Sequence, residues 1–135
     1  MQDVTNCIVM QTNDVLKISP EGDFFRVWAD FLKPAHHLTK REMDVLGAFL
    51  KERYILSKSI KDDNLLNRIL TSTEGRKKVR NAVGIKAKHL NVIMHNFRKK
   101  GVLSKDNKFY LRLIPSLYED GRGAGLTIYF KFDNE

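Results

Sequence analysis

The stretch between Gly84 and Gly101 constrains the fold more than any other part of the sequence. Apolar residues recur there with the spacing of one face of an amphipathic helix: Leu90, Ile93, Met94 and Phe97. We therefore predict a helix over about 86–100 with this stripe buried. Glycine readily adopts the left-handed conformation that terminates many helices. Gly84 is thus expected to end a preceding helix, and Gly101 to end this one.

Several shorter helices are predicted upstream. Thr39 and Glu42 have the spacing of a capping box, and Leu38 can pack on Met43, so a helix should begin there and bury one face. The inward residues of that face are Met43, Leu46, Leu50 and Tyr54. A second capping box is predicted from Thr71 to Glu74, leading into a helix with Val79, Ala82 and Val83 inward.

Two smaller helices complete the helical prediction. Asp62 or Asp63 should cap a short helix that carries Leu65, Leu66, Ile69 and Leu70. Nearer the N-terminus, a helical stripe is expected to stop at Pro34, because proline disrupts helix interiors. The residues of that stripe are Phe24, Val27, Trp28 and Phe31.

Three segments favour β-structure. Residues 4–10 and 15–18 are β-prone runs around a polar turn, which predicts an N-terminal hairpin. Residues 102–103 and 109–113 predict a second hairpin with a basic tip. Apolar and polar residues alternate over 126–132, as in a half-buried terminal strand.

The segment from Val83 to Leu103 resembles the winged helix-turn-helix superfamily. The likeness lies in the apolar-Gly-apolar turn at 83–85, the inward residues at 90, 94 and 97, the glycine four positions after Phe97, and the apolar pair that follows. It extends over about residues 38–113. It implies a trihelical core with a β-hairpin wing. Together with the predicted N-terminal hairpin and short helix and the C-terminal strand, the expected fold is α+β.

One domain is expected over 1–135. Its parts would be 1–35 (hairpin and short helix), 36–113 (winged-helix core) and 114–135 (loop and strand).

The charge is concentrated in one third of the chain. The sequence has 24 Lys and Arg against 16 Asp and Glu, a net charge of +8. Residues 72–113 alone carry 12 basic and 2 acidic side chains, a net +10. Such a cluster is typical of a surface that meets a polyanion. A solvated helix face is the alternative.

If the partner is DNA, the outer face of the 86–100 helix should meet the major groove. Asn91 and Asn96 would read base edges, with Val92 and His95 beside them. Lysines and arginines on the helices and the wing would hold the backbone. The predicted DNA-contacting residues are Arg76, Lys77, Arg80, Lys86, Lys88, Asn91, His95, Asn96, Arg98, Lys99, Lys105 and Lys108.

Catalysis is not expected. His36, His37, His89 and His95 lack metal-binding spacing, and Cys7 is the single cysteine, so we expect no metal and no cofactor. The glycine-rich run 121–125 has no following Lys-Ser/Thr and fails as a phosphate loop. The carboxylates form no candidate acid–base pair, and no small-molecule substrate is expected.

Membrane insertion and export are also not expected. No apolar run approaches about 20 residues, and the N-terminal Met-Gln-Asp-Val-Thr-Asn lacks the layout of a secretory signal. A cytoplasmic protein is expected, or a virion protein if the chain is phage-encoded.

Two functions fit these features. The first is a small DNA-binding protein that uses the 86–100 helix and the 104–109 wing on duplex DNA, as a transcription regulator or a replication or packaging accessory. The second is a structural or interaction component of a phage particle or multisubunit assembly, which uses the winged helix for protein contacts. Its terminal strands would bind a protein partner or further copies of the chain. A loose likeness to small winged-helix proteins of tailed bacteriophages, in Lys- and Asn-rich composition, fits either function.

Overall fold

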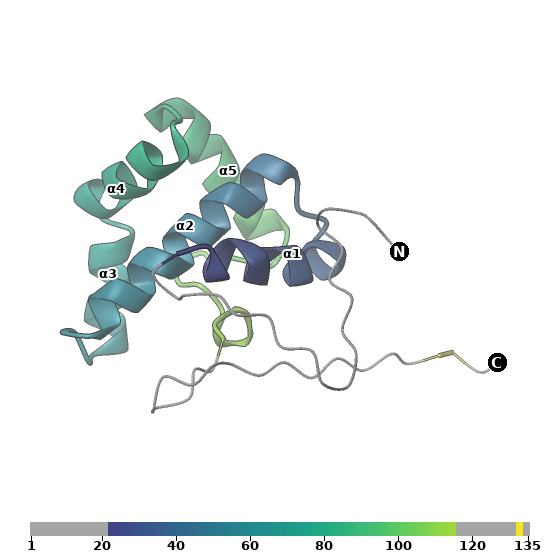
Figure 1. Cartoon of the computed structure of the whole chain (residues 1–135), viewed down its shortest axis with the longest axis horizontal. Helices are drawn as coiled ribbons and strands as arrows, with labels where there is room; N and C mark the ends of the chain where they lie inside the picture. The colour runs from purple at the N-terminus through teal and green to yellow at the C-terminus, as the bar shows by residue number, and fades with distance from the viewer. Residues whose placement is uncertain (1–21, 116–131, 134–135) are drawn as a thin grey trace.

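The computed structural model describes residues 22–115 and 132–133. Five α-helices and one short 3-10 helix follow one another along this part of the chain (Figure 1). They are α1 (Phe24–His36), α2 (Lys40–Ser57), α3 (Asp63–Leu70), α4 (Thr73–Val83), α5 (Ala87–Lys99) and η1 (Leu111–Leu113). Within this part, no helix is both long and apolar enough to cross a membrane.

Helix α2 is the centre of the fold. Each of the other four α-helices contacts it, and α4 and α5 meet at one end of the molecule (Figure 1). Phe49 of α2 and Phe97 of α5 are fully buried, and the Phe49 ring packs 5.2 Å, centroid to centroid, from that of Phe109. Trp28 of α1 donates a 2.8 Å hydrogen bond to the carbonyl oxygen of Leu113. The chain after α5 is therefore anchored to both α1 and α2.

The helix-start signals are largely confirmed. Thr39 and Glu42 form the predicted capping box at the start of α2, and the Asp62 carboxylate caps α3. The prediction for α4 is wrong by one residue: Ser72, not Thr71, accepts from the Gly75 amide. The Thr71 hydroxyl donates instead to the Asn67 carbonyl of α3, 2.8 Å away, so it belongs to the end of the preceding helix.

The prediction for α1 is wrong in two details. The helix continues through Pro34 to His36 and ends where His37 adopts a left-handed conformation (φ 55°). Proline at this position removes one bond, the one that an amide there would give to the Asp30 carbonyl, and the helix ends two residues later. The buried face also differs: Phe25, Trp28 and Ala29 are buried, whereas Phe31 is 40% exposed.

The expected α+β fold with a β-hairpin wing is also wrong. The described residues contain helices and no strand, and only one isolated antiparallel bridge, Leu103 to Phe109. The amides of Val102 and Leu103 both donate to the carbonyl of Phe97, at 2.9 and 3.2 Å, so they close the end of α5. On the other side, the chain turns into η1 directly after Tyr110. Two hydrogen bonds flank the bridge, from the Ser104 amide to the Lys108 carbonyl (2.8 Å) and from the Tyr110 amide to the Val102 carbonyl (3.5 Å), so the two arms pair over only a few residues.

Two β predictions lie outside the described residues: the N-terminal hairpin over 4–18 and most of the C-terminal strand over 126–132. Cys7 and the glycine-rich run 121–125 lie outside them as well.

Gly75 sets how closely α3 and α4 approach each other. A Cβ atom built on Gly75 would lie 2.1 Å from the Leu70 carbonyl oxygen and 2.5 Å from that of Ile69. Both contacts are with backbone, so a side chain could be accommodated only by moving one helix away from the other. Gly84 differs, because it has a φ of 80° and open space around its Cβ position.

These two glycines allow a matched test of the helix junctions. We expect Gly75→Ala to lower the free energy of unfolding by about 3 kcal/mol or more, because it forces backbone apart. Gly84→Ala should cost about 1–2 kcal/mol, the strain of a left-handed residue with a side chain. Urea denaturation followed by circular dichroism measures both. Equal losses would contradict the close approach of α3 and α4.

Candidate nucleic-acid interface

The α4–α5 junction is built around Gly84. Its amide donates to the Arg80 carbonyl at 2.7 Å, and the Ile85 amide donates to the same oxygen at 3.1 Å. The left-handed conformation of Gly84 then turns the chain, and Lys86 becomes the N-cap residue of α5. The Lys86 side chain makes no capping hydrogen bond, and the first turn of α5 contains no acidic residue. Positive potential at this helix start is therefore uncompensated locally.

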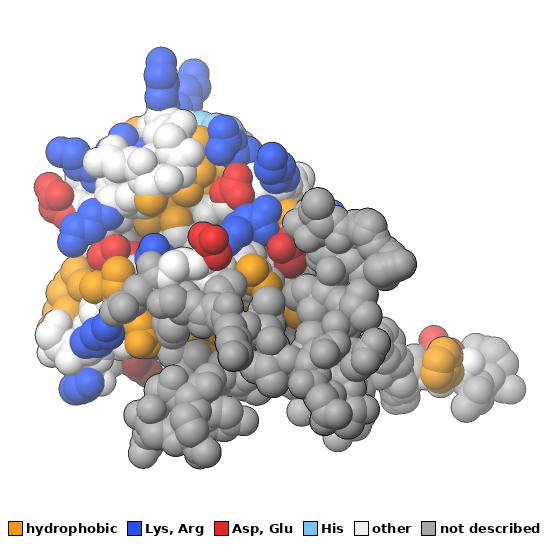
Figure 2. All heavy atoms as spheres, viewed as in Figure 1, with side chains coloured by type: hydrophobic (Ala, Val, Ile, Leu, Met, Phe, Trp, Pro, Cys, Tyr) orange, Lys and Arg blue, Asp and Glu red, His pale blue; other side chains and the backbone are white. Residues whose placement is uncertain are grey.

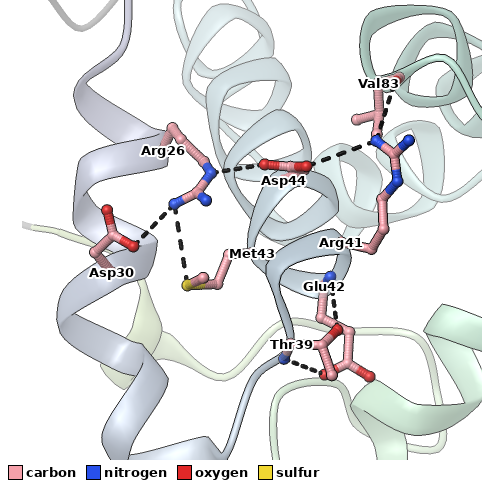
Figure 3. Close-up of polar contacts among 8 residues, drawn as sticks. All are labelled: Arg26, Asp30, Thr39, Arg41, Glu42, Met43, Asp44 and Val83. Atoms are coloured by element: carbon pink, nitrogen blue, oxygen red, sulfur yellow. Dashed lines mark hydrogen bonds and ion pairs between the residues drawn. The ribbon is translucent and has the colours of Figure 1, made fainter. Parts of the chain in front are cut away.

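Side chains near the start of α2 contact the end of α4, next to this junction. Arg41 approaches the Val83 carbonyl at the end of α4 (3.5 Å) and pairs with Asp44 at 3.6 Å (Figure 3). Asp44 also accepts a 2.7 Å hydrogen bond from Arg26 of α1, which pairs in turn with Asp30 at 3.0 Å (Figure 3). A chain of alternating charges thus runs from α1 across α2 to the last residue of α4.

The buried Glu42 carboxylate holds the other end of α5. One oxygen accepts from the Thr39 amide at 2.9 Å and from the Lys100 ammonium at 2.6 Å. The other accepts from the Asn96 carboxamide at 3.2 Å. Glu42 is 2% exposed. The same side chain therefore caps α2 and binds the last turn of α5.

Burial of Glu42 would by itself raise the pKa of its carboxyl group. The hydrogen bonds from Lys100, Thr39 and Asn96, together with the positive charge of Lys100, outweigh that effect and hold the pKa below its ordinary value. The carboxylate is thus charged at neutral pH, as these contacts require.

The cations of α4 and α5 greatly outnumber their anions. Eight lysines and arginines occur between Thr73 and Lys99, against the single carboxylate of Glu74. Lys78 pairs with Glu52 at 3.6 Å. Within residues 22–115, the other seven pair with no carboxylate: Arg76, Lys77, Arg80, Lys86, Lys88, Arg98 and Lys99. Figure 2 shows Lys and Arg side chains projecting from the end of the molecule that α4 and α5 form.

Two arginines of α4 lie beside the start of α5. Arg76 and Arg80 line a cavity of about 140 Å³ together with Ala87, Leu90 and Asn91. The fold therefore brings the predicted backbone-contacting arginines next to a predicted base-contacting asparagine. We refer to Arg76, Arg80 and the outer face of α5, with Lys86 at its start, as the α4–α5 surface.

The outer face of α5 is a continuous exposed stripe. Its members follow the i, i+3, i+4, i+7 spacing of one helix face and then one more turn: Lys88, Asn91, Val92, His95 and Lys99. The opposite stripe, predicted from the sequence, is confirmed as core: Leu90, Ile93, Met94 and Phe97 are all buried. Helix α5 thus separates its core residues completely from its exposed ones.

Five predicted contact residues lie outside the α4–α5 surface, and one of them, Lys77, is exposed elsewhere on α4; the others are Asn96, Arg98, Lys105 and Lys108. Asn96 points toward α2 and donates to Glu42, so its carboxamide is not on the outer face. The Lys108 ammonium donates to the Asn64 side chain of α3 at 2.7 Å. Arg98 donates to the Asn107 side chain at 2.7 Å and ties the 104–108 loop to α5, where Lys105 is exposed.

Sequence reasoning missed the double role of Glu42. Its capping-box spacing was visible, but the contacts with Asn96 and Lys100 join residues 54 and 58 positions apart. One signal was present, because a Lys directly before Gly101 is well placed to complement the end of a helix.

A second, larger cavity of about 540 Å³ lies between α1, α2 and α4. Charged side chains line it, and several neutralise each other, notably Arg26 with Asp44 and Lys78 with Glu52. Among the described residues, no three His, Cys, Asp or Glu side chains gather as a metal site would require.

Comparison with known proteins finds no matching family model, no similar curated protein and no similar solved structure.

Replacing Glu42 tests the contact that holds α5. We expect Glu42→Gln to lower the free energy of unfolding at pH 7 by about 3 kcal/mol, because Lys100 loses its partner in a mostly buried pair. The folded-state pKa is below the ordinary value of 4.5. The carboxylate therefore contributes stability above that value, and the contribution disappears as the pH falls through the folded pKa.

The gap between wild type and Glu42→Gln should accordingly narrow between pH 5 and pH 2, as measured by urea denaturation. Glu74→Gln is the matched control, since Glu74 is an exposed glutamate in the first turn of α4. A gap that stays constant over this pH range would contradict the assigned role of Glu42.

Proposed function

We propose that this chain binds duplex DNA through the α4–α5 surface, with the outer face of α5 in the major groove. The supporting observation is the joining of Arg76 and Arg80 with Asn91 around the start of α5. Phosphate-binding and base-reading side chains then occupy one surface, as recognition of DNA requires.

The dimensions of α5 suit this proposal. Its 13 residues span about 20 Å, and the major groove of B-DNA is about 12 Å wide, enough for one helix. Asn91 and His95 lie one helical turn apart on the exposed stripe, flanked by Lys88 and Lys99. With α5 bound in the groove, the two lysines would contact phosphates, and Asn91 and His95 would contact base edges.

The free cations also favour a polyanion over plain solvation. A solvated helix face normally mixes charges of both signs, whereas the stretch from Thr73 to Lys99 holds one carboxylate and eight cations. Arg76 and Arg80 are partly buried against the cavity, and a guanidinium suits bidentate contact with a phosphate.

Charge reversal at the start of α5 tests the proposal. Lys86→Glu with Lys88→Glu should weaken binding to a mixed-sequence duplex at least tenfold at low salt. It should also reduce the slope of log K against log salt by about 1.8, because each phosphate contact contributes about 0.9. Fluorescence anisotropy over a salt series gives both values.

Lys33→Glu with Lys61→Glu is the matched control. It makes the same change in net charge at two exposed lysines outside α4 and α5. If both pairs of substitutions weaken binding equally, attraction is due to net charge and the assigned surface is wrong. If the wild type does not bind at low salt, the proposal fails.

The alternative, a component of a protein assembly, is favoured by one other observation. Leu65 and Ile69, one helical turn apart on α3, are 41% and 37% exposed, and Leu111 is 73% exposed. Exposed apolar side chains at helical spacing suit a protein contact. Light scattering separates the two functions: a defined oligomer that Leu65→Ser with Ile69→Ser dissociates, together with no binding to DNA, would favour assembly.

A further inference from the structure

Val92 is a large apolar residue in the middle of a polar surface. It is 53% exposed on the outer stripe of α5, and its stripe neighbours Lys88, Asn91 and His95 are also exposed. The buried stripe of α5 supplies its contacts with the core. Valine is also a poorer helix former than alanine or lysine. Neither packing nor helix propensity explains Val92.

A protein-docking patch does not explain Val92 either. Such patches are contiguous apolar areas of several hundred Å². Val92 instead lies between cationic and polar side chains, apart from the buried core residues of its own helix. Its surroundings match those expected for a nucleic-acid groove.

The major groove presents one apolar group, the C5-methyl of thymine. It also presents the N6 and N7 atoms of adenine, which an asparagine carboxamide can bind in a bidentate manner. Asn91 is exposed next to Val92, and within residues 22–115 its side chain makes no hydrogen bond, unlike that of Asn96. The chain therefore carries a complementary group for each distinguishing feature of an A·T pair.

We infer that α5 prefers A·T-containing sites, with Val92 against a thymine methyl group and Asn91 on an adenine. This inference rests on the proposed binding of duplex DNA. It adds a sequence preference that phosphate contacts alone would not produce.

The test replaces thymine by uracil, which removes only the C5-methyl group. Wild-type protein should bind an A·T-rich duplex about fourfold more tightly than the same duplex with every thymine replaced by uracil, the effect of burying one methyl group. Val92→Ser removes both methyl groups of the side chain and should abolish this preference. Val92→Thr keeps one methyl group and should retain part of it. Anisotropy titrations measure all six combinations.

Asn91→Ala provides the second arm. It should reduce the preference for an A·T-rich over a G·C-rich duplex by about tenfold, within the range of one bidentate base contact. The thymine-to-uracil ratio should stay unchanged, because Val92 remains. Circular dichroism of each variant checks folding, and exposed positions on α5 are expected to leave it intact.

The outcomes separate this inference from the proposal beneath it. Salt-sensitive binding with equal affinity for thymine and uracil duplexes overturns the inference and leaves DNA binding in place. A uracil effect that persists in Val92→Ser comes from duplex shape, and it overturns the assignment to Val92. No binding to any duplex overturns both. Loss of self-association in Val92→Ser, measured by light scattering, would mean that Val92 contacts protein.

Discussion

The orientation of the α4–α5 surface depends on one buried carboxylate. Glu42 caps α2 through the Thr39 amide, and the same group binds Asn96 and Lys100 at the end of α5. An uncompensated buried charge is costly, so these contacts must form together. At the opposite end of α5, Arg41 approaches the last carbonyl of α4. Two adjacent residues in the first turn of α2 therefore contact both helices of the surface, Arg41 at the end of α4 and Glu42 at the end of α5.

In this arrangement the exposed side chains of α5 are not needed to hold the helix in place. The core stripe holds the helix by apolar contact and the Glu42 cluster sets its rotation, so the exposed side chains can vary at little cost in stability. Surface substitutions away from such contacts usually change stability by less than about 0.5 kcal/mol. Binding and folding can then be measured separately in this protein, which many interfaces do not allow.

The helices could be predicted from local sequence, whereas the structure of residues 102–113 could not. Caps and apolar stripes act over three to seven residues, so Thr39, Asp62 and the buried stripe of α5 were all visible in the sequence. The 102–113 region has the composition of a hairpin. However, the amides of Val102 and Leu103 are taken by the Phe97 carbonyl, and that competition depends on how α5 ends. Of the candidate site, Asn96 was misplaced for a similar reason, since its partner Glu42 is 54 residues away.

The contrast between Asn91 and Asn96 shows how the fold selects among chemically identical groups. Both lie on α5, and either carboxamide can hydrogen-bond to adenine, so the sequence alone does not distinguish them as base-contacting candidates. In the structure Asn96 donates to a buried carboxylate, and moving it to a base would leave Glu42 short of a donor inside the core. The Asn91 side chain makes no such hydrogen bond within residues 22–115, and it lines a cavity together with Arg76 and Arg80. A base-reading role can therefore fall to Asn91 without loss of stability, and its neighbour on the helix is the exposed valine that the core does not use.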